Sequence, residues 1–292
     1  MSNRHDLELH RESLADIRNI MNSMKTLAYM ENRKLARLLA SQQALSRNIE
    51  EAAADLLAHF PDLLPADHRA KSVLVVVGTE RGFCGNFNQK LARHIDSMME
   101  ADAPAPLLVI IGHKLLTPMG NHPGVEVSLA GATVSEDIPE LLNRLVEHLT
   151  ALQAKHGALN LSCLYHTEPD KIDLRQLLPS FRELAPSAPD NTGEPLIHME
   201  PEALLKELSE QYLLSELHEI FSTSLNAENL NRVTHLDGAV RKLDEKASEL
   251  TRRANALRQE EIIEEIEVIL LNASAVKGDT GDDHPFAKKA PS

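Results

Sequence analysis

The residues best placed for chemistry lie in a glycine-containing loop at positions 78–86, Gly-Thr-Glu-Arg-Gly-Phe-Cys-Gly-Asn. The loop follows a β-branched run at 72–77 and precedes a helical pattern, which is where a phosphate-binding loop would lie. Its glycines are spaced G-x3-G-x2-G, whereas the dinucleotide fingerprint is G-x-G-x-x-G, and the chain has no G-x4-G-K-[ST] motif. We therefore expect a tight turn with positive φ angles, with nucleotide binding as the alternative.

Other reactive residue types form no recognised catalytic or metal-binding motif. Cys84 precedes a helical pattern, so it is either a reactive thiol or, as we expect, a packed side chain. The 14 histidines include no H-E-x-x-H motif and no pair spaced by four residues, and no G-x-S-x-G elbow is present. We expect these histidines, among them His166, to lie on the surface. The sequence therefore predicts no metal, no cofactor and no catalytic residue.

Composition and charge exclude several classes of protein. The 292 residues carry a net charge of −14, which argues against nucleic acid as the main partner. Two cysteines, Cys84 and Cys163, cannot form a disulfide framework or a four-thiolate metal site. No apolar run approaches the roughly 20 residues that span a bilayer, and residues 1–6 lack the apolar core of a signal peptide. We expect contact with a membrane only through other proteins.

The first 60 residues indicate a long helix. Neither proline nor glycine occurs before Pro61, and aromatic residues make up only 3% of the chain, so the apolar bulk is aliphatic and suits packing along a helical seam. With Leu14 as position a, eleven of thirteen a and d positions in residues 14–56 are apolar. The thirteen positions are Leu14, Ile17, Met21, Met24, Ala28, Glu31, Leu35, Leu38, Gln42, Leu45, Ile49, Ala52 and Leu56.

The C-terminal third indicates a second, longer helix. Between Glu202 and Val276 the only glycine or proline is Gly238. A second apolar stripe changes phase at Ile262, and a band of basic residues at 241–258 precedes five glutamates at 260–267. The stripe comprises Val233, Leu236, Val240, Leu243, Ala247, Leu250, Ala254 and Leu257. We expect the two helices to pair as an antiparallel coiled coil, and the banded part of the second helix to meet another protein.

The middle of the chain alternates between strand and helix patterns. Strands are expected at 72–77, 105–111 and 159–165, and helices at 88–99 and 138–156, with Ser135 as the N-cap of the second helix. Alternation at these spacings predicts parallel pairing through right-handed crossovers. The fold class is therefore α/β plus coiled coil, with long antiparallel N- and C-terminal helices flanking an inserted, Rossmann-like domain with a parallel sheet.

Four parts are expected along the chain. They are an N-terminal coiled-coil helix (1–60), an α/β domain with linkers (61–200, with a proline-containing linker at 184–201), a C-terminal coiled-coil helix (201–276) and a disordered tail (277–292).

Three regions together resemble the gamma subunit of F-type ATP synthases, in a divergent, bacterial-type form. Residues 80–88, E-R-G-F-C-G-N-F-N, resemble the family's D-R-G-L-C-G-G-L-N loop. The N-terminal helix carries Asn19, Lys25 and Lys34 where the family pattern places Asn, Lys and Lys. The C-terminal helix follows the family pattern at Glu228-x3-Arg232 and again from Glu249 onward. The loop residues that carry the resemblance are Arg81, Gly82, Cys84, Gly85 and Asn88.

This resemblance implies a noncatalytic central-stalk rotor subunit. Such a subunit turns inside a ring of alpha and beta subunits and couples ion flow through the membrane c-ring to conformational change at catalytic sites on beta. The implied partners also include the epsilon subunit, and the implied location is peripheral, on the cytoplasmic face of the bacterial cell membrane. The residues implied as contacts to acidic loops of the beta subunits are Lys25, Arg252, Arg253, Arg258 and Gln259.

Two other classes of protein remain as alternatives. The loop at 78–85 would suit a small α/β nucleotide-binding protein or enzyme with helical arms. The two stripes alone would suit a coiled-coil adaptor that forms a self-contained rod or a homodimer.

Overall fold

The structure is a computed structural model that describes residues 2–63, 70–99, 105–120, 122, 124–182 and 197–278. The chain divides into two compact units, a smaller one of residues 1–22 with 238–292 and a larger one of residues 23–237. The linker expected at 184–201 lies outside the described residues up to position 196. The expected tail lies outside them after Gly278, the residue at which the last helix ends.

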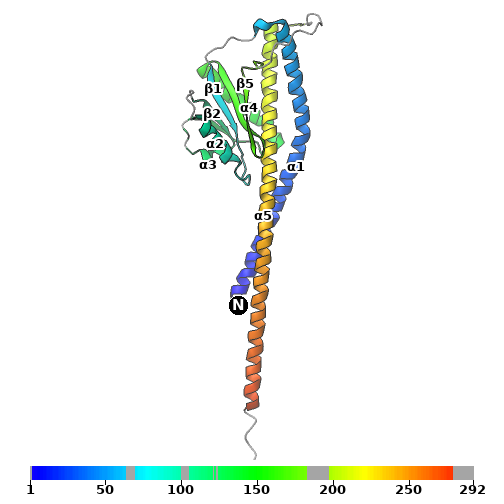
Figure 1. Ribbon diagram of the computed structural model, residues 1–292, viewed down its shortest axis with the longest axis vertical. Helices are drawn as coiled ribbons and strands as arrows, with labels where there is room; N and C mark the ends of the chain where they lie inside the picture. Colours follow the sequence, from blue (N-terminus) through cyan, green and yellow to red (C-terminus); the bar gives the residue numbers. More distant parts are fainter. Residues whose placement is uncertain are drawn as a thin grey trace, which may run out of the picture. The chain divides into compact units, whose positions relative to one another are not determined.

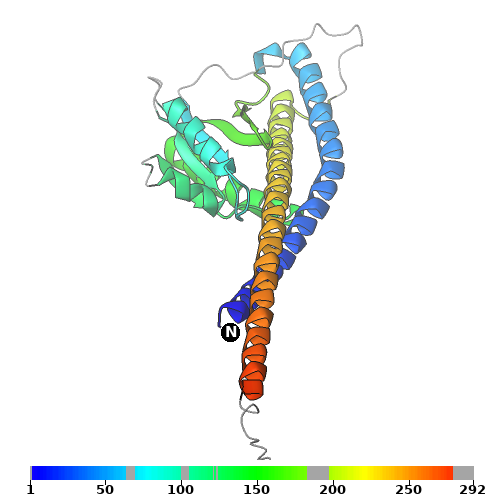
Figure 2. The same ribbon diagram turned by 60° about the horizontal axis from the view of Figure 1, so that its bottom comes forward.

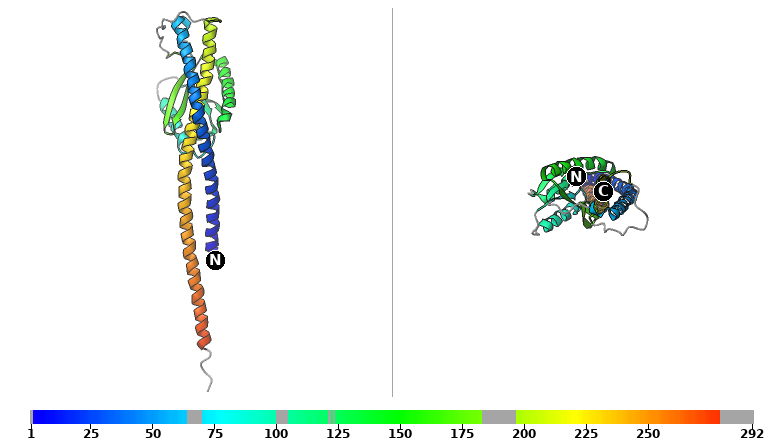
Figure 3. Two further views of the ribbon diagram at one scale, coloured as in Figure 1. Left: turned by 90° about the vertical axis from the view of Figure 1, so that its right-hand side faces the viewer. Right: turned by 90° about the horizontal axis from the view of Figure 1, so that it is seen from above.

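Two long helices begin and end the described chain, as the absence of proline and glycine predicts. Helix α1 spans Ser2–His59 and helix α5 spans Pro201–Gly278. In the larger unit, side-chain contacts pair Lys25 with Asp237, and Ser46 with Ser215. The residue numbers on α1 therefore increase in the direction in which those on α5 decrease. The helices therefore run antiparallel there, side by side (Figures 1 and 3).

A five-stranded sheet forms the centre of the larger unit. Its strands are β1 (Lys71–Val77), β2 (Leu107–Ile111), β3 (Val125–Leu129), β4 (Leu159–Glu168) and β5 (Lys171–Leu178), in the order β3-β2-β1-β4-β5. Strand β1 pairs in parallel with β2 and β4, which confirms the three expected strands and their direction. The sequence analysis missed β3, which is parallel to β2, and β5, which is antiparallel to β4.

Helices cover both faces of this sheet (Figures 1 and 2). Alternate residues of β1 point to opposite sides: Val73, Val75 and Val77 pack with α4 (Ile138–His156) and with Leu217, Ile220 and Phe221 of α5. Leu74 and Val76 pack with α2 (Phe87–Met99) and α3 (His113–Met119). Because α5 directs large apolar side chains into this core, it is anchored to the α/β domain by hydrophobic burial.

The start of α4 differs from the expectation. Ser135 is not its N-cap, because Ser135–Asp137 form a short 3-10 helix, η2, and Asp137 is the residue that precedes α4. The Asp137 carboxylate accepts hydrogen bonds from Thr133 N and Oγ1 and from Val134 N, which organises the turn that leads into α4. A second 3-10 helix, η1 (Pro61–Leu63), follows α1.

The seam expected on α1 has the right period but a different face. The predicted a positions point inward, and Leu35 is fully buried. The predicted d positions are only partly confirmed, since Met24 and Glu31 are half-buried. Leu38 and Leu45 are 41% and 50% exposed, whereas Ser46, the residue after Leu45, is buried. The same shift of one residue brings Lys25 and Asn32 to the inner face, where they bind Asp237 and Asn226 of α5.

The physical reason lies in α5. Part of its side next to α1 is apolar, where Leu205 packs with Leu56 and Leu57. Elsewhere this side carries Ser215, Asn226 and Asp237. Polar side chains of α1 meet these partners, since a buried polar group without a hydrogen bond would be costly. The stripe predicted on α5 is confirmed, with Leu236, Val240 and Leu250 buried.

Candidate functional site: the glycine loop and its contacts with α5

The loop after β1 begins where two strand ends approach each other closely. A Cβ atom on Gly78 would lie 2.6 Å from Leu115 Cβ, and one on Gly112, at the end of β2, would lie 2.7 Å from Thr79 O. Gly112 also has a φ of +91°, which a side chain rarely tolerates. These glycines therefore allow the strand ends and α3 to pack together, and they set where the loop leaves the sheet.

The tight turn predicted from the glycines is present, with positive φ at Gly85 and at Phe83 rather than at Gly78 or Gly82. Gly85 has a φ of 57°, and Phe83 has a φ of 64° although it carries a side chain. Phenylalanine in this left-handed region is strained, and the strain persists only where neighbouring contacts hold the backbone.

Those contacts come from α5. Asn231 Nδ2 donates to Cys84 O at 2.9 Å, and Arg232 Nε donates to Gly82 O at 3.3 Å. Arg232 Nη2 also lies 3.2 Å from Cys84 Sγ and forms an ion pair with Glu228. Arg232 Nη1 donates to Asn229 Oδ1 at 2.7 Å. Asn231 and Arg232 of α5 therefore hold the backbone and the thiol of the loop, and Glu228 and Asn229 hold the Arg232 guanidinium.

Burial shifts the pKa values of Glu228 and Cys84. Glu228 and Arg232 are only 4% and 5% exposed, and desolvation raises the pKa of Glu228 to about 7, although Arg232 favours the ionised form. Desolvation also raises the pKa of Cys84 to about 12, assisted by the neighbouring Glu228. Because a thiolate is the reactive form of cysteine, Cys84 is a packed, unreactive thiol, as the sequence analysis predicts.

Two further side chains shape the loop. Asn88, in the first turn of α2, accepts from Thr79 N at 3.1 Å and donates to Thr79 Oγ1 at 2.9 Å. Glu80 accepts from Gly131 N at 2.8 Å and from His113 N at 3.1 Å, so it ties the loop to the ends of β2 and β3. Burial opposes ionisation of Glu80, but these hydrogen bonds prevail and lower its pKa.

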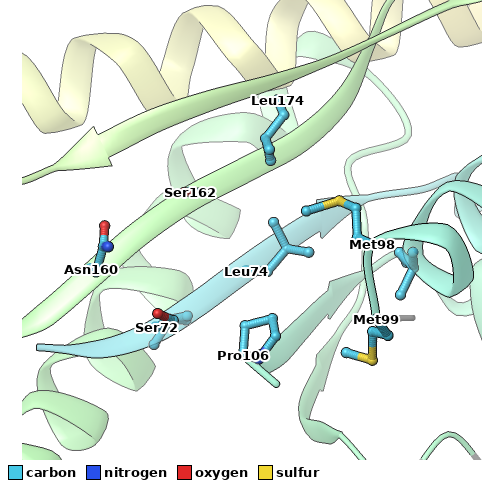
Figure 4. A pocket seen from close by; sticks show the side chains of 10 residues that line it. Ser72, Leu74, Met98, Met99, Pro106, Asn160, Ser162 and Leu174 are labelled. Atoms are coloured by element: carbon cyan, nitrogen blue, oxygen red, sulfur yellow. The ribbon is translucent and has the colours of Figure 1, made fainter. Parts of the chain in front are cut away.

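The loop borders a cavity of about 750 Å³ at the carboxyl ends of β1 and β2, lined by Arg81, Lys114 and His235 among others. A second, largely apolar cavity of about 210 Å³ lies near the other end of the sheet, between Leu74, Met98, Pro106 and Leu174 (Figure 4). This volume is below that of most ligand pockets, which hold roughly 300–1,000 Å³.

The residues proposed from sequence as beta-subunit contacts fall into two environments. Lys25 lies in the larger unit, where its Nζ is 3.0 Å from Asp237 Oδ1 and the pair is partly buried. Arg252, Arg253, Arg258 and Gln259 lie on α5 in the smaller unit with exposed side chains. Arg253 forms an ion pair with Glu249 one turn earlier. Their binding to the beta subunits stays a prediction.

Sequence reasoning missed several of these functional side chains. Glu228 and Arg232 are matched residues of the family pattern, but their role as the anchor of the loop appears only when α5 packs against it. His166 was expected on the surface and is fully buried, stacked on Phe87 with ring centroids 3.8 Å apart. Nothing in the local sequence distinguishes this histidine, because its strand reaches the interior only through the pairing of β4 with β1.

Among the described residues, no group of three or more His, Cys, Asp or Glu side chains is arranged to hold a metal ion. None of the helices, within the residues described, has a stretch both long and apolar enough to cross a membrane.

Solved structures share this fold. A chain of the Euglena gracilis mitochondrial ATP synthase, from an assembly of OSCP, F1 and c-ring, superposes with a TM-score of 0.65 over 99% of both chains at 13% identity. A chain of the Tetrahymena thermophila mitochondrial ATP synthase central stalk and c-ring gives a TM-score of 0.55 over 75% of this chain and 99% of that chain, at 14% identity. The fold is thus the one found in the central stalks of rotary ATP synthases.

The family follows from the sequence comparisons. The family model described as ATP synthase matches residues 3–276. The ATP synthase gamma chain of Moorella thermoacetica is 25% identical over 95% of this chain and all of its own length, and that of Heliobacterium modesticaldum is 24% identical over 94% and all of its length. The chain therefore belongs to the ATP synthase gamma chain family, as a divergent member and a noncatalytic rotor subunit of the central stalk.

Proposed function

We propose that this chain turns inside a ring of alpha and beta subunits and couples ion flow through a membrane c-ring to conformational change at catalytic sites on beta. In this account the helical segments 1–60 and 201–276 form the shaft, and residues 61–200 form a domain beside it. The face of the shaft that a catalytic site contacts shifts the equilibrium between the conformations of that site, because the contact is more favourable in one conformation than in another.

One observation carries this proposal: the last described part of α5 exposes a dense set of large apolar side chains. Their exposed fractions run from 45% to 69%, too many neighbouring apolar side chains for a helix surface that stays in water. A protein sleeve around the helix would cover them on all sides. The residues are Ile262, Ile263, Ile266, Val268, Ile269, Leu270 and Leu271.

The exposed basic side chains of α5 support the proposed contacts with the beta subunits. Arg252, Arg253 and Arg258 are exposed on α5, together with Gln259, in a chain whose net charge is −14. Exposed guanidinium groups are suited to bidentate binding of carboxylates, so acidic loops of the beta subunits are the proposed partners. Lys25 would join them by exchanging its partner Asp237 for a beta carboxylate.

The related assemblies support the proposal of the remaining partners. The matched Euglena and Tetrahymena chains come from assemblies that contain a c-ring, and the Euglena assembly also contains F1. We infer that the α/β domain and the adjoining helix ends bind the epsilon subunit and the c-ring. The chain would then be peripheral, attached through these subunits to the cytoplasmic face of a bacterial cell membrane.

Reconstitution with isolated alpha and beta subunits tests this function. Replacing Ile266 and Ile269 by Asp places charge in the apolar surface of α5, and it should prevent this chain from entering the complex. Leu174→Asp is the matched control, since Leu174 is also an exposed apolar residue, 43% exposed, but lies on β5. The proposal fails if alpha and beta form a complex with normal ATP hydrolysis whether or not the chain is present.

A further inference from the structure

The loop at 81–85 directs its carbonyl groups and its amide groups to opposite sides. Side chains of α5 donate hydrogen bonds to the carbonyl oxygens of Gly82 and Cys84, so both carbonyls point toward that helix. In a trans peptide the N–H lies opposite the carbonyl, so the amides of Phe83 and Gly85 point away from these donors. Neither amide donates to another residue in the described part of the chain. Two backbone donors of the loop are therefore available to a ligand.

The backbone from Gly82 to Gly85 has the alternation found in anion-binding turns. Phe83 and Gly85 have φ values of 64° and 57°, whereas φ is not positive at Gly82 or Cys84. Such alternation turns successive N–H groups toward one concave side, and these nests bind phosphate and other anions. The left-handed conformation is strained for a phenylalanine, and strain of this kind clusters at sites that clamp a ligand. The strained turn is therefore consistent with an anion site.

Gly82 leaves open space beside the loop. A Cβ atom at this position would meet no atom within 4 Å, and the residue does not have a positive φ. Neither close packing nor the backbone conformation therefore requires a glycine here. A glycine also serves where a ligand must approach the backbone closely, and Gly82 borders the cavity of about 750 Å³ described above.

This cavity has a local excess of positive charge in a chain whose net charge is −14. Arg81 of the loop, Lys114 of α3 and His235 of α5 border it, and none of its lining residues is acidic. Neither Arg81 nor Lys114 forms an ion pair or a side-chain hydrogen bond with another described residue. Asp137 and Glu228 act on Arg81 electrostatically, but both carboxylates already accept hydrogen bonds from their own neighbours. The two cations are thus available to an anionic ligand.

The size and the other lining residues of the cavity fit a small phosphorylated molecule. A volume of about 750 Å³ lies within the range of roughly 300–1,000 Å³ that is usual for ligand pockets. The cavity lies at the carboxyl ends of β1 and β2, the edge at which open α/β sheets bind their ligands. The ring of Phe83, 44% exposed, also borders it, and aromatic rings stack on nucleobases.

We propose that the loop 81–85 and the cavity beside it bind the phosphate chain of a small phosphorylated molecule, with the amides of Phe83 and Gly85 and the side chains of Arg81 and Lys114 as donors. The guanidinium of Arg81 suits bidentate binding of a phosphate, and Lys114 adds a point charge. The ligand is held without a covalent bond and is not transformed. All of these residues belong to the larger unit, so the site does not depend on assembly with other subunits.

Titration calorimetry of the full-length chain with pyrophosphate and with ATP, at low ionic strength and without divalent ions, tests this site. Each ligand should bind once per chain with a Kd of roughly 1 mM or lower, and the amide signals of Phe83 and Gly85 should shift most in magnetic resonance spectra. Roughly tenfold tighter binding of ATP that Phe83→Leu removes identifies a nucleotide as the ligand, whereas equal affinities identify the phosphate chain alone. Absence of binding of both ligands at about 10 mM would overturn the proposal.

Variants of the lining residues assign the site. Gly82→Leu places a side chain in the open space, so it should abolish binding and leave the melting temperature unchanged. Arg81→Ala and Lys114→Ala should each weaken binding about tenfold, through loss of a charge-assisted hydrogen bond. Arg93→Ala is the matched control: it removes the same charge from the exposed side of α2, outside the cavity, and should weaken binding at most about twofold.

Melting followed by circular dichroism shows whether each variant is folded, and Lys114→Ala decides if Gly82→Leu is not. Native affinity for pyrophosphate in the folded variants, or an equal loss in Arg93→Ala, would overturn the site. Tighter binding of a tetraglutamate peptide than of pyrophosphate would also overturn the proposal, because the cavity would then suit the carboxylates of a protein segment.

Discussion

Ser46 Oγ on α1 lies 2.9 Å from Ser215 Oγ on α5, and both side chains are buried. This hydrogen bond belongs to a set of polar contacts that join the two helices within the larger unit. The others pair Lys25 with Asp237 and Asn32 with Asn226, and Tyr212 donates to Glu50. Matched polar groups therefore join the two helices in addition to the apolar contacts of Leu56 and Leu57 with Leu205, and hydrophobic burial anchors α5 to the sheet.

Replacing Ser46 by Ala should destabilise the chain by about 1–3 kcal/mol, because the Ser215 hydroxyl is then buried without its partner. Ser215→Ala should cost a similar amount, and the double variant should cost less than the sum of the two. Urea unfolding of the four proteins measures the coupling. Strict additivity of the two single effects would show that the hydroxyls do not stabilise the helix pair together.

A comparison of two leucines on α1 tests which face of the helix is buried. Leu35→Ala should cost about 2–5 kcal/mol, since Leu35 is fully buried in the core. Leu45→Ala should change the free energy of unfolding by less than about 0.5 kcal/mol, because Leu45 is half exposed. The sequence-derived seam assigns both residues to the interior, so similar losses in the two variants would support that seam and contradict the structure.

The sequence predicts the long helices and three strands well because their signals are local. Absence of glycine and proline from residues 1–60 and 203–237 is enough to indicate helix, and β-branched runs bounded by glycine indicate β1 and β2. The missed strands also had a signal: Val125–Leu129 alternates apolar and polar residues, and Lys171–Leu178 does so up to Arg175, which is the pattern of strands at the edge of a sheet.

The buried face of α1 and the anchor of the loop depend on the side chains of neighbouring elements, which a local pattern does not contain. A heptad on α1 predicts the period but not the face: Leu45 is 50% exposed, and the next residue, Ser46, is buried and bonded to Ser215 of α5. The family resemblance places Gly82, Cys84 and Asn88 in one loop motif. In the structure Asn88 bonds to Thr79, whereas Gly82 and Cys84 contact Arg232. Their anchor on Arg232 lies about 150 positions along the chain, and a single sequence contains no sign of that contact.

Lowering the pH should reduce the free energy of unfolding through buried His166. Burial lowers the pKa of His166, while its hydrogen bonds to the carbonyls of Phe87 and Glu168 act in the opposite direction. Since the unfolded chain binds a proton at its ordinary pKa of about 6.5, the stability that neutral His166 provides is present above that value and is lost as pH falls toward the lower, folded pKa.

The test compares the pH dependence of unfolding in two histidine variants. His166→Gln should reduce the loss of stability between pH 7 and pH 5, with a slope difference of at most about 1.4 kcal/mol per pH unit. His156→Gln removes an exposed histidine at the end of α4 and should leave the slope as it is. An unchanged slope in His166→Gln would mean that His166 takes up its proton equally in both states.

Arg258→Glu should weaken coupling between ATP hydrolysis and ion transport in the reconstituted complex without unfolding the chain. Arg258 is exposed, so reversing its charge disturbs a partner's carboxylate and not the helix itself. Coupled transport and ATP hydrolysis, measured in membrane vesicles, report the effect. Arg93→Glu makes the same charge change on the exposed side of α2 and is the control. An unchanged hydrolysis rate and unchanged transport in Arg258→Glu would remove Arg258 from the proposed contact.

The central claim, a rotor subunit held between an alpha–beta ring and a c-ring, is tested most directly by purifying a tagged form of this chain from its own membranes. The account predicts that alpha, beta, epsilon and c subunits accompany it in a fixed ratio. The account is contradicted if the folded, tagged chain is recovered without alpha and beta from membranes whose ATP synthase remains intact.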